Sequence, residues 1–159
     1  MEGKSLRSLE QRRASFAWKK AGSVPMEKRK EYTSWVKKLP AMIMTNGLGQ
    51  TMAFLKSKSK EDEGQQGMYD LLYKHISEWL TSDADIPLAW HNEVKQKSDI
   101  IERIVHECTG SIIYRQAAQE ALALISWLKR FAEALPTEKK EEPGKVYEKD
   151  TSTEKSKGT

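Results

Sequence analysis

Residues 114–135, YRQAAQEALALISWLKRFAEAL, carry the clearest structural signal in this 159-residue sequence. Their apolar side chains recur with spacings of 3, 4, 3, 4, 3 and 4, at Tyr114, Ala117, Ala121, Leu124, Leu128, Phe131 and Leu135. This repeat is typical of one face of an α-helix. Ala117 and Ala121 are small, so a neighbouring helix could approach closely. We therefore expect a long C-terminal helix that packs along its length against other helices.

Helical periodicity also extends through the preceding residues. No segment shows the sustained apolar-polar alternation of β-strands. The sequence predicts an all-α fold, a compact helical bundle of about six helices. The expected helices cover residues 5–21, 26–39, 48–57, 68–80, a short turn near Pro87 and Trp90, 98–108 and 114–135.

Prolines, glycines and polar runs predict where these helices begin and end. Ser5 is the expected N-cap of the first helix. Pro40 should break or kink the second helix because it lacks a backbone donor. Gly47, after Asn46, is expected to form a left-handed C-cap. Residues 56–67 contain no apolar side chain and are expected to form a mobile loop.

Two sets of apolar side chains are expected to face the core. One set is the inner face of helix 98–108, formed by Ile101, Ile104, Val105 and Cys108. The other consists of the tryptophans on apolar stripes, Trp18, Trp35, Trp79 and Trp127. Trp90 falls in a loop, and the sequence does not assign it.

Length and composition indicate one helical domain, residues 1–135, followed by a tail, residues 136–159. The tail is charged, rich in Ser and Thr, and expected to be disordered. No apolar run approaches the roughly 20 residues that cross a bilayer, and the chain starts with charged residues, so we expect a cytoplasmic protein without membrane contact. Cys108 is the only cysteine, which excludes an internal disulfide and a multi-cysteine zinc site.

Charge is distributed unevenly along the chain. Residues 1–60 hold 14 Lys and Arg against 4 Asp and Glu, whereas residues 61–135 hold 7 against 13. This asymmetry predicts a polyanion-binding surface in the first half and an acid-rich, protein-binding surface in the second. The candidate phosphate-binding residues are Arg12, Arg13, Lys19, Lys20, Lys37, Lys38 and Lys56, with Arg115, Lys129 and Arg130 as second choices. The alternative is that these cations only solvate helix surfaces, or that Arg115 and Arg130 pair with Glu120 or Glu133.

The sequence contains no complete motif of a known class of catalytic site. Gly47-Leu48-Gly49 has Met52 where a dinucleotide fingerprint needs a third glycine, and no strand precedes it. The three histidines are scattered along the chain. Glu102 and His106, four residues apart with Cys108 nearby, form the best metal or acid-base candidate, but such a pair is more often solvated. We therefore expect no enzyme, no cofactor and no metal.

Two segments carry a resemblance to a known family. Residues 45–56, TNGLGQTMAFLK, and the stretch 114–135 each resemble the corresponding part of the small helical subunit of the Cmr complex, the type III-B RNA-guided CRISPR effector. Residues 9–18, 36–40 and 72–80 support the match in order and spacing. The family is that of the fifth Cmr protein, part of the RAMP module in antiviral defence.

The resemblance implies a non-catalytic role. Subunits of this family stack as an inner filament with further copies of themselves, beside the backbone subunits that carry the guide crRNA. They hold target single-stranded RNA through its phosphates and connect the large subunit to the backbone, while neighbouring subunits cleave. Two alternatives remain open: a metal-dependent helical nuclease, and a helix-turn-helix protein that binds duplex DNA.

Overall fold

The computed structural model describes residues 6–61, 67–83, 85–86 and 88–138. Within this part of the chain every regular element is helical, which confirms the all-α prediction. The helices are α1 (Leu9–Ser23), α2 (Met26–Asn46), α3 (Leu48–Ser59), α4 (Met68–Leu80), α5 (Asn92–Lys95), α6 (Ile100–Val105) and α7 (Ser111–Ala134). None of them is both long and apolar enough to span a membrane.

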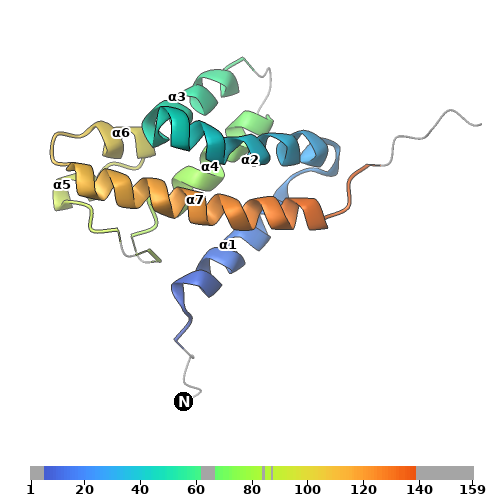
Figure 1. Cartoon of the computed structure of the whole chain (residues 1–159), viewed down its shortest axis with the longest axis horizontal. Coiled ribbons are helices and arrows are strands. Elements are labelled where there is room, and N and C mark those ends of the chain that lie inside the picture. Colours follow the sequence, from blue (N-terminus) through green and yellow to red (C-terminus); the bar gives the residue numbers. More distant parts are fainter. Residues whose placement is uncertain (1–5, 62–66, 84, 87, 139–159) are drawn as a thin grey trace, which may run out of the picture.

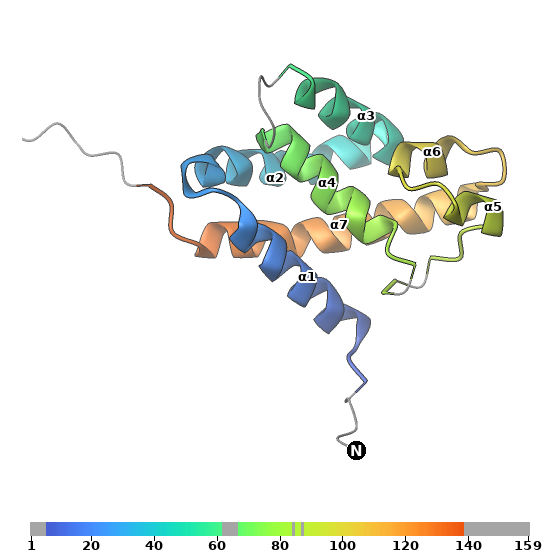
Figure 2. The same ribbon diagram turned by 180° about the vertical axis from the view of Figure 1, so that it is seen from behind.

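The long helix α7 runs the length of the molecule and packs against α1, α2, α3 and α4 (Figure 1). α2 lies antiparallel to α7. The Arg29 side chain near the start of α2 donates to the carbonyl of Pro136, and Gly49, beyond the end of α2, donates its amide to the Tyr114 hydroxyl at the start of α7. α1 crosses α7 on the other side of the bundle, as Figure 2 shows, and α5 and α6 lie at the end where α7 begins.

The core forms where the apolar stripes of these helices meet. α4 buries every residue that the helical spacing of residues 68–80 places on one face, and Trp79 is the largest fully buried of them. These residues are Met68, Leu71, Leu72, His75, Ile76, Trp79 and Leu80. In α7 the predicted positions Ala117, Ala121, Leu124 and Leu128 are all buried. The helical repeat in the sequence therefore identified the inner faces of the two most amphipathic helices correctly.

Several predicted helix ends were wrong. Ser8, not Ser5, caps α1: its hydroxyl accepts from the Gln11 amide, while the Gln11 side chain accepts from the Ser8 amide. The expected end at residue 21 was also wrong, because α1 continues through Gly22 to Ser23. The predicted loop at 56–67 begins later, because α3 continues to Ser59, and residues 62–66 lie outside the described part.

Pro40 lies inside α2, so of the predicted break or kink the break was wrong, and so was the predicted end at residue 39. An internal proline costs about 3 kcal/mol because a backbone hydrogen bond is lost. Val36, Leu39 and Ile43 are buried on one face of the same helix, and this packing favours an uninterrupted α2. At the end of α2 the predicted turn is present: Gly47 has φ +85°, and its amide donates to the Ile43 carbonyl.

Two predictions about buried side chains were also wrong. Val105 is 72% exposed, whereas Ile100 and Arg103 are the residues that α6 buries. Trp18 is 53% exposed and lies edge-on to Phe131 of α7, with ring centroids 5.2 Å apart. Trp79 is buried as predicted, and Trp90, which the sequence left unassigned, is 3% exposed. Of the predicted tail, residues 136–138 are described and residues 139–159 are not.

Candidate nucleic-acid interface

The predicted phosphate-binding side chains lie on four helices. α1 carries Arg12, Arg13, Lys19 and Lys20, α2 carries Lys37 and Lys38, α3 carries Lys56, and α7 carries Arg115, Lys129 and Arg130. Among them Lys19, Lys37, Lys38, Arg115, Lys129 and Arg130 are exposed. The structure gathers part of this set at two places, and it holds Arg13, Lys20 and Lys56 in ion pairs. Arg115, Lys129 and Arg130 stay exposed on α7.

The larger place is a groove of about 650 Å³ between the N-terminal half of α2 and the C-terminal end of α7. Three lysines, three hydroxyl side chains, two apolar residues and one acid line it: Lys30, Lys37, Lys38, Thr33, Ser34, Thr137, Ala132, Leu135 and Glu133. Lysine ammonium groups and Ser or Thr hydroxyl groups are among the groups that contact phosphates in protein–nucleic acid complexes. We refer to this surface as the α2–α7 groove.

Glu133 is the one acid in the lining of this groove. Its carboxylate lies 3.0 Å from Nζ of Lys37. The hydrogen bond from Lys37, together with the charges of Lys37, Lys129 and Arg130, lowers the pKa of Glu133. Lys129 and Arg130 thus extend the positive potential of the groove along α7. Lys38 is held over the Trp35 ring, with Nζ 4.6 Å from the centroid.

A second, smaller pocket of about 170 Å³ lies between α1 and the C-terminal end of α4. Arg7, Arg12, Ser15, Lys19 and Asp85 line its polar part, and Phe16 and Trp79 line the rest. Arg12 donates to the Asp85 carbonyl, and its Nε is buried without a hydrogen-bond partner among the described residues. We refer to this site as the α1 pocket.

The other predicted cations of the first half form ion pairs. Arg13 binds Glu120 through two hydrogen bonds, Lys20 pairs with Glu78, and Lys56 lies 2.8 Å from Asp99. Burial acts to raise the pKa of Glu120, but the hydrogen bonds from Arg13 and Trp79 outweigh it, and the pKa is lowered. These side chains therefore already have acidic partners within the chain. The acids that the sequence offered to Arg115 and Arg130 pair instead with Arg13 and Lys37.

Sequence reasoning missed Lys30 and Arg7 as members of the two basic sites. A signal for Lys30 was present, because Lys30, Ser34 and Lys37 follow the i, i+4, i+7 spacing of one helical face. Arg7 precedes α1, so no periodicity could have placed it beside Lys19.

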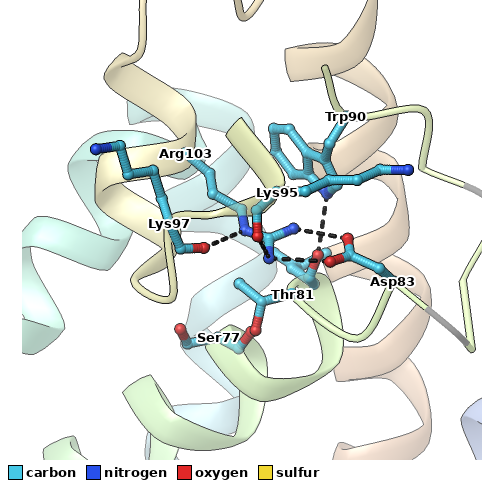
Figure 3. A network of polar contacts seen from close by, with 8 residues as sticks. Ser77, Thr81, Asp83, Trp90, Lys95, Lys97 and Arg103 are labelled. Atoms are coloured by element: carbon cyan, nitrogen blue, oxygen red, sulfur yellow. Dashed lines mark hydrogen bonds and ion pairs between the residues drawn. The ribbon is translucent and has the colours of Figure 1, made fainter. Parts of the chain in front are cut away.

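Arg103 is a cation with a different role. It is 3% exposed, and its guanidinium binds both oxygens of Asp83 and the carbonyls of Lys95 and Lys97 (Figure 3). Its Cζ also lies 5.8 Å from the ring centroid of Trp90. Arg103 therefore fastens the connection between α4 and α6 and does not contribute to a surface.

Comparisons with known proteins agree with the helical architecture. Residues 9–135 match the family model described as CRISPR-associated protein (Cas_Cmr5). The chain is 30% identical over 136 residues to "CRISPR system Cmr subunit Cmr5" of Thermotoga maritima, which covers 85% of this chain and 90% of that protein. A crystal structure of a CRISPR-associated Cmr5 family protein from Thermus thermophilus is similar with a TM-score of 0.57 and 25% identity, over 82% of this chain and 98% of that one. The resemblance seen in the sequence is thereby confirmed, and the chain belongs to the Cas_Cmr5 family of CRISPR-associated proteins.

Proposed function

We propose that this protein is the non-catalytic small subunit of a type III-B Cmr complex and holds target single-stranded RNA along the guide through phosphate contacts. Family membership supports the first part, because the relative from Thermotoga maritima is named as a Cmr subunit. On this proposal the protein works in the cytoplasm. Its partners are the backbone and large subunits, further copies of itself in an inner filament, the guide crRNA and the target RNA.

The observation that carries RNA binding is the α2–α7 groove. Lys30, Lys37 and Lys38 project into it beside hydroxyl groups, and one carboxylate offsets them. Lysines on a helical scaffold neutralise phosphates without reading bases, so the groove suits a strand whose sequence is read by pairing with the guide. The α1 pocket, with Arg7, Arg12 and Lys19, is the second expected contact.

The ion pairs narrow the set of predicted contacts. Arg13, Lys20 and Lys56 would each have to leave an acidic partner before binding a phosphate. Arg115, Lys129 and Arg130 are exposed on α7, and for their side chains no ion pair is present among the described residues. We therefore expect Lys129 and Arg130, next to the groove, to contribute more than Lys56.

A salt titration of single-stranded RNA binding tests the proposal. The wild-type chain should show a linear fall of log affinity with log salt, by about 0.7 per phosphate contacted. The triple variant Lys30→Ala, Lys37→Ala, Lys38→Ala should lower this slope by about 2. A matched control, Lys74→Ala, Lys95→Ala, Lys97→Ala, removes the same charge from other exposed positions and should leave the slope nearly unchanged.

Two results would contradict the proposal. If both triple variants lower the slope equally, the binding reflects net charge and not the groove. If the purified wild-type protein cleaves the RNA when divalent metal is added and no partner subunit is present, the nuclease alternative is favoured. The same variants assembled into the complex with guide RNA report whether the groove acts there too, through crosslinking to bound target.

A further inference from the structure

Three side chains able to bind a metal meet at the end of the bundle formed by α5 and α6. They are His91, Glu93 and Cys108, and one ligand atom of each lies within 4.8 Å of those of the other two. The Cys108 thiol donates to Oε2 of Glu93 at 3.7 Å. His91 is the N-cap of α5 and Glu93 lies in its first turn, whereas Cys108 lies in the connection from α6 to α7. Tertiary folding thus joins two segments that are distant in sequence.

We propose that His91, Glu93 and Cys108 bind one Zn²⁺ ion, with water as the fourth ligand. Imidazole, carboxylate and thiolate are all ordinary zinc ligands, and the thiolate favours zinc over magnesium or calcium. When the sulfur binds the ion, the thiol proton is released to solvent. The thiolate and the carboxylate together then neutralise the two positive charges of the ion.

The geometry needs a small adjustment. Zinc bonds of about 2.0–2.3 Å place tetrahedral ligand atoms roughly 3.3–3.8 Å apart, so the present group must contract by about 1 Å. His91 and Glu93 are exposed, and their side chains can rotate without disturbing the core. His91 must also give up the hydrogen bond that its Nδ1 accepts from the Glu93 amide at 3.3 Å. If the metal binds Nδ1, this nitrogen can no longer accept the hydrogen bond. If the metal binds Nε2, Nδ1 carries the ring proton and again cannot accept.

The site differs from the candidate visible in the sequence, which combined Glu102 and His106 with Cys108. Glu102 is not part of the group. Nδ1 of His106 accepts the Cys108 amide at 3.1 Å, so His106 orients the backbone of the cysteine. His106 would therefore support Cys108 from the backbone side while His91 supplies the imidazole ligand.

A bound ion would further restrict the motion of α5, which Arg103 of α6 already contacts. α5 packs on α6, and Arg103 of α6 binds the carbonyls of Lys95, the last residue of α5, and of Lys97, two residues later (Figure 3). The ion would add a second connection, from α5 to the segment between α6 and α7. Its effect should be local, with slower amide exchange at residues 91–97 and 105–110.

Titration of tag-free, chelator-treated protein with Zn²⁺, and with Co²⁺ as a spectroscopic probe, tests the site. Wild type should bind one ion per chain, raise its melting temperature with Zn²⁺, and show near-ultraviolet sulfur-to-cobalt absorbance. The variants His91→Ala, Glu93→Gln and Cys108→Ser should each weaken zinc binding at least about tenfold, and Cys108→Ser should abolish the absorbance. Glu102→Gln, a matched exposed acid of α6, should bind zinc like wild type.

Three outcomes would overturn the proposal. The first is the lack of one-to-one binding at micromolar zinc. The second is equal affinity in wild type, His91→Ala and Cys108→Ser. The third is loss of binding in Glu102→Gln and His106→Ala with binding retained in His91→Ala, which would assign the ion to the other set. Far-ultraviolet circular dichroism of each variant without metal checks that it folds. This control matters most for Cys108→Ser, because Cys108 packs against the hydrophobic core, whereas His91 and Glu93 are exposed.

Discussion

Arg13 of α1 binds Glu120 of α7 through two short hydrogen bonds, from Nε to Oε1 at 2.6 Å and from Nη2 to Oε2 at 2.7 Å. Oε1 of Glu120 also accepts from the indole nitrogen of Trp79 at 2.8 Å. Glu120 is 7% exposed, so three helices are joined around one buried carboxylate. This arrangement places α1 on the bundle and removes Arg13 from the free surface cations.

Breaking this pair should destabilise the protein. Arg13→Ala leaves the Glu120 charge buried and unpaired, and we expect the free energy of unfolding to fall by about 3 kcal/mol, at the lower end for buried pairs because Arg13 is partly exposed. Urea denaturation measures this. The double variant Arg13→Met, Glu120→Gln removes both charges and keeps an acceptor for Trp79, so it should recover most of the loss. A double variant as unstable as Arg13→Ala would show that the charge pair is not the cause.

The buried pair Tyr32 and His75 should make stability depend on pH. The Tyr32 hydroxyl lies 2.8 Å from Nδ1 of His75. Burial, aided by the nearby charge of Lys20 and opposed by Asp70, lowers the pKa of His75 from 6.5 to about 4. Between these values the unfolded chain binds more protons than the folded one, so stability falls as pH drops from 6.5 to 4. The loss should amount to about 3 kcal/mol.

Urea denaturation between pH 4 and 8 checks this dependence. His75→Gln removes the titrating group and should flatten the curve in that window, although the variant is less stable throughout. Tyr32→Phe keeps the imidazole and should retain the dependence on pH. If wild type and His75→Gln lose stability in parallel, another group is responsible.

Gly47 should resist substitution. Its φ of +85° with ψ of 162° belongs to a region that is essentially restricted to glycine, and an added Cβ would lie 3.0 Å from the Tyr114 hydroxyl. Gly47→Ala should therefore lower the free energy of unfolding by about 1–3 kcal/mol. Gly22→Ala is the matched control, because a Cβ there meets no atom within 4 Å. Thermal melts that show equal losses for both variants would contradict the argument.

Arg103 should keep the segment between α4 and α6 rigid. Arg103→Lys keeps the charge but cannot bind both oxygens of Asp83 and two carbonyls at once. We expect a loss of about 2–3 kcal/mol, together with faster amide exchange at residues 88–97. Hydrogen exchange followed by mass spectrometry resolves this segment. A uniform increase over all helices would show that Arg103 supports the whole fold and not this connection.

Glu133 should limit RNA binding in the α2–α7 groove. It holds Lys37 at 3.0 Å, so Glu133→Gln releases that ammonium and removes the one acid of the lining. RNA should then bind more tightly, with a salt slope steeper by about 0.7. Glu78→Gln, which releases Lys20 on α1, is the comparison for a cation outside the groove. Unchanged binding in Glu133→Gln would remove Lys37 from the contact.

Much of the fold could be read from periodicity. The stripes of α4 and α7 were identified because six or seven apolar residues at helical spacing define one face of a helix, whichever helices pack against it. Short and weakly amphipathic elements were harder. Val105 was assigned to the core because a helix over residues 98–108 was expected, with Val105 on its inner face. α6 instead ends at Val105, which is exposed.

The candidate sites were predicted less completely than the fold. The charge count located the cationic half of the chain but could not tell free lysines from paired ones, because an ion pair such as Lys56 and Asp99 joins residues 43 positions apart. The sequence likewise did not pair His91 with Cys108, because these residues are 17 positions apart. Their segments become neighbours only when α5 packs on α6.

The sequence by itself determined the all-α class, the long last helix, the glycine turn at Gly47 and the family, since each rests on local spacing or on an ordered set of short motifs. Tertiary structure alone decided that α2 passes through Pro40, that Glu120 takes Arg13, and that Lys30 and Lys37 face α7 across a groove. The physical reason is that backbone preferences act over one helical turn, whereas burial and charge pairing depend on which helices pack together.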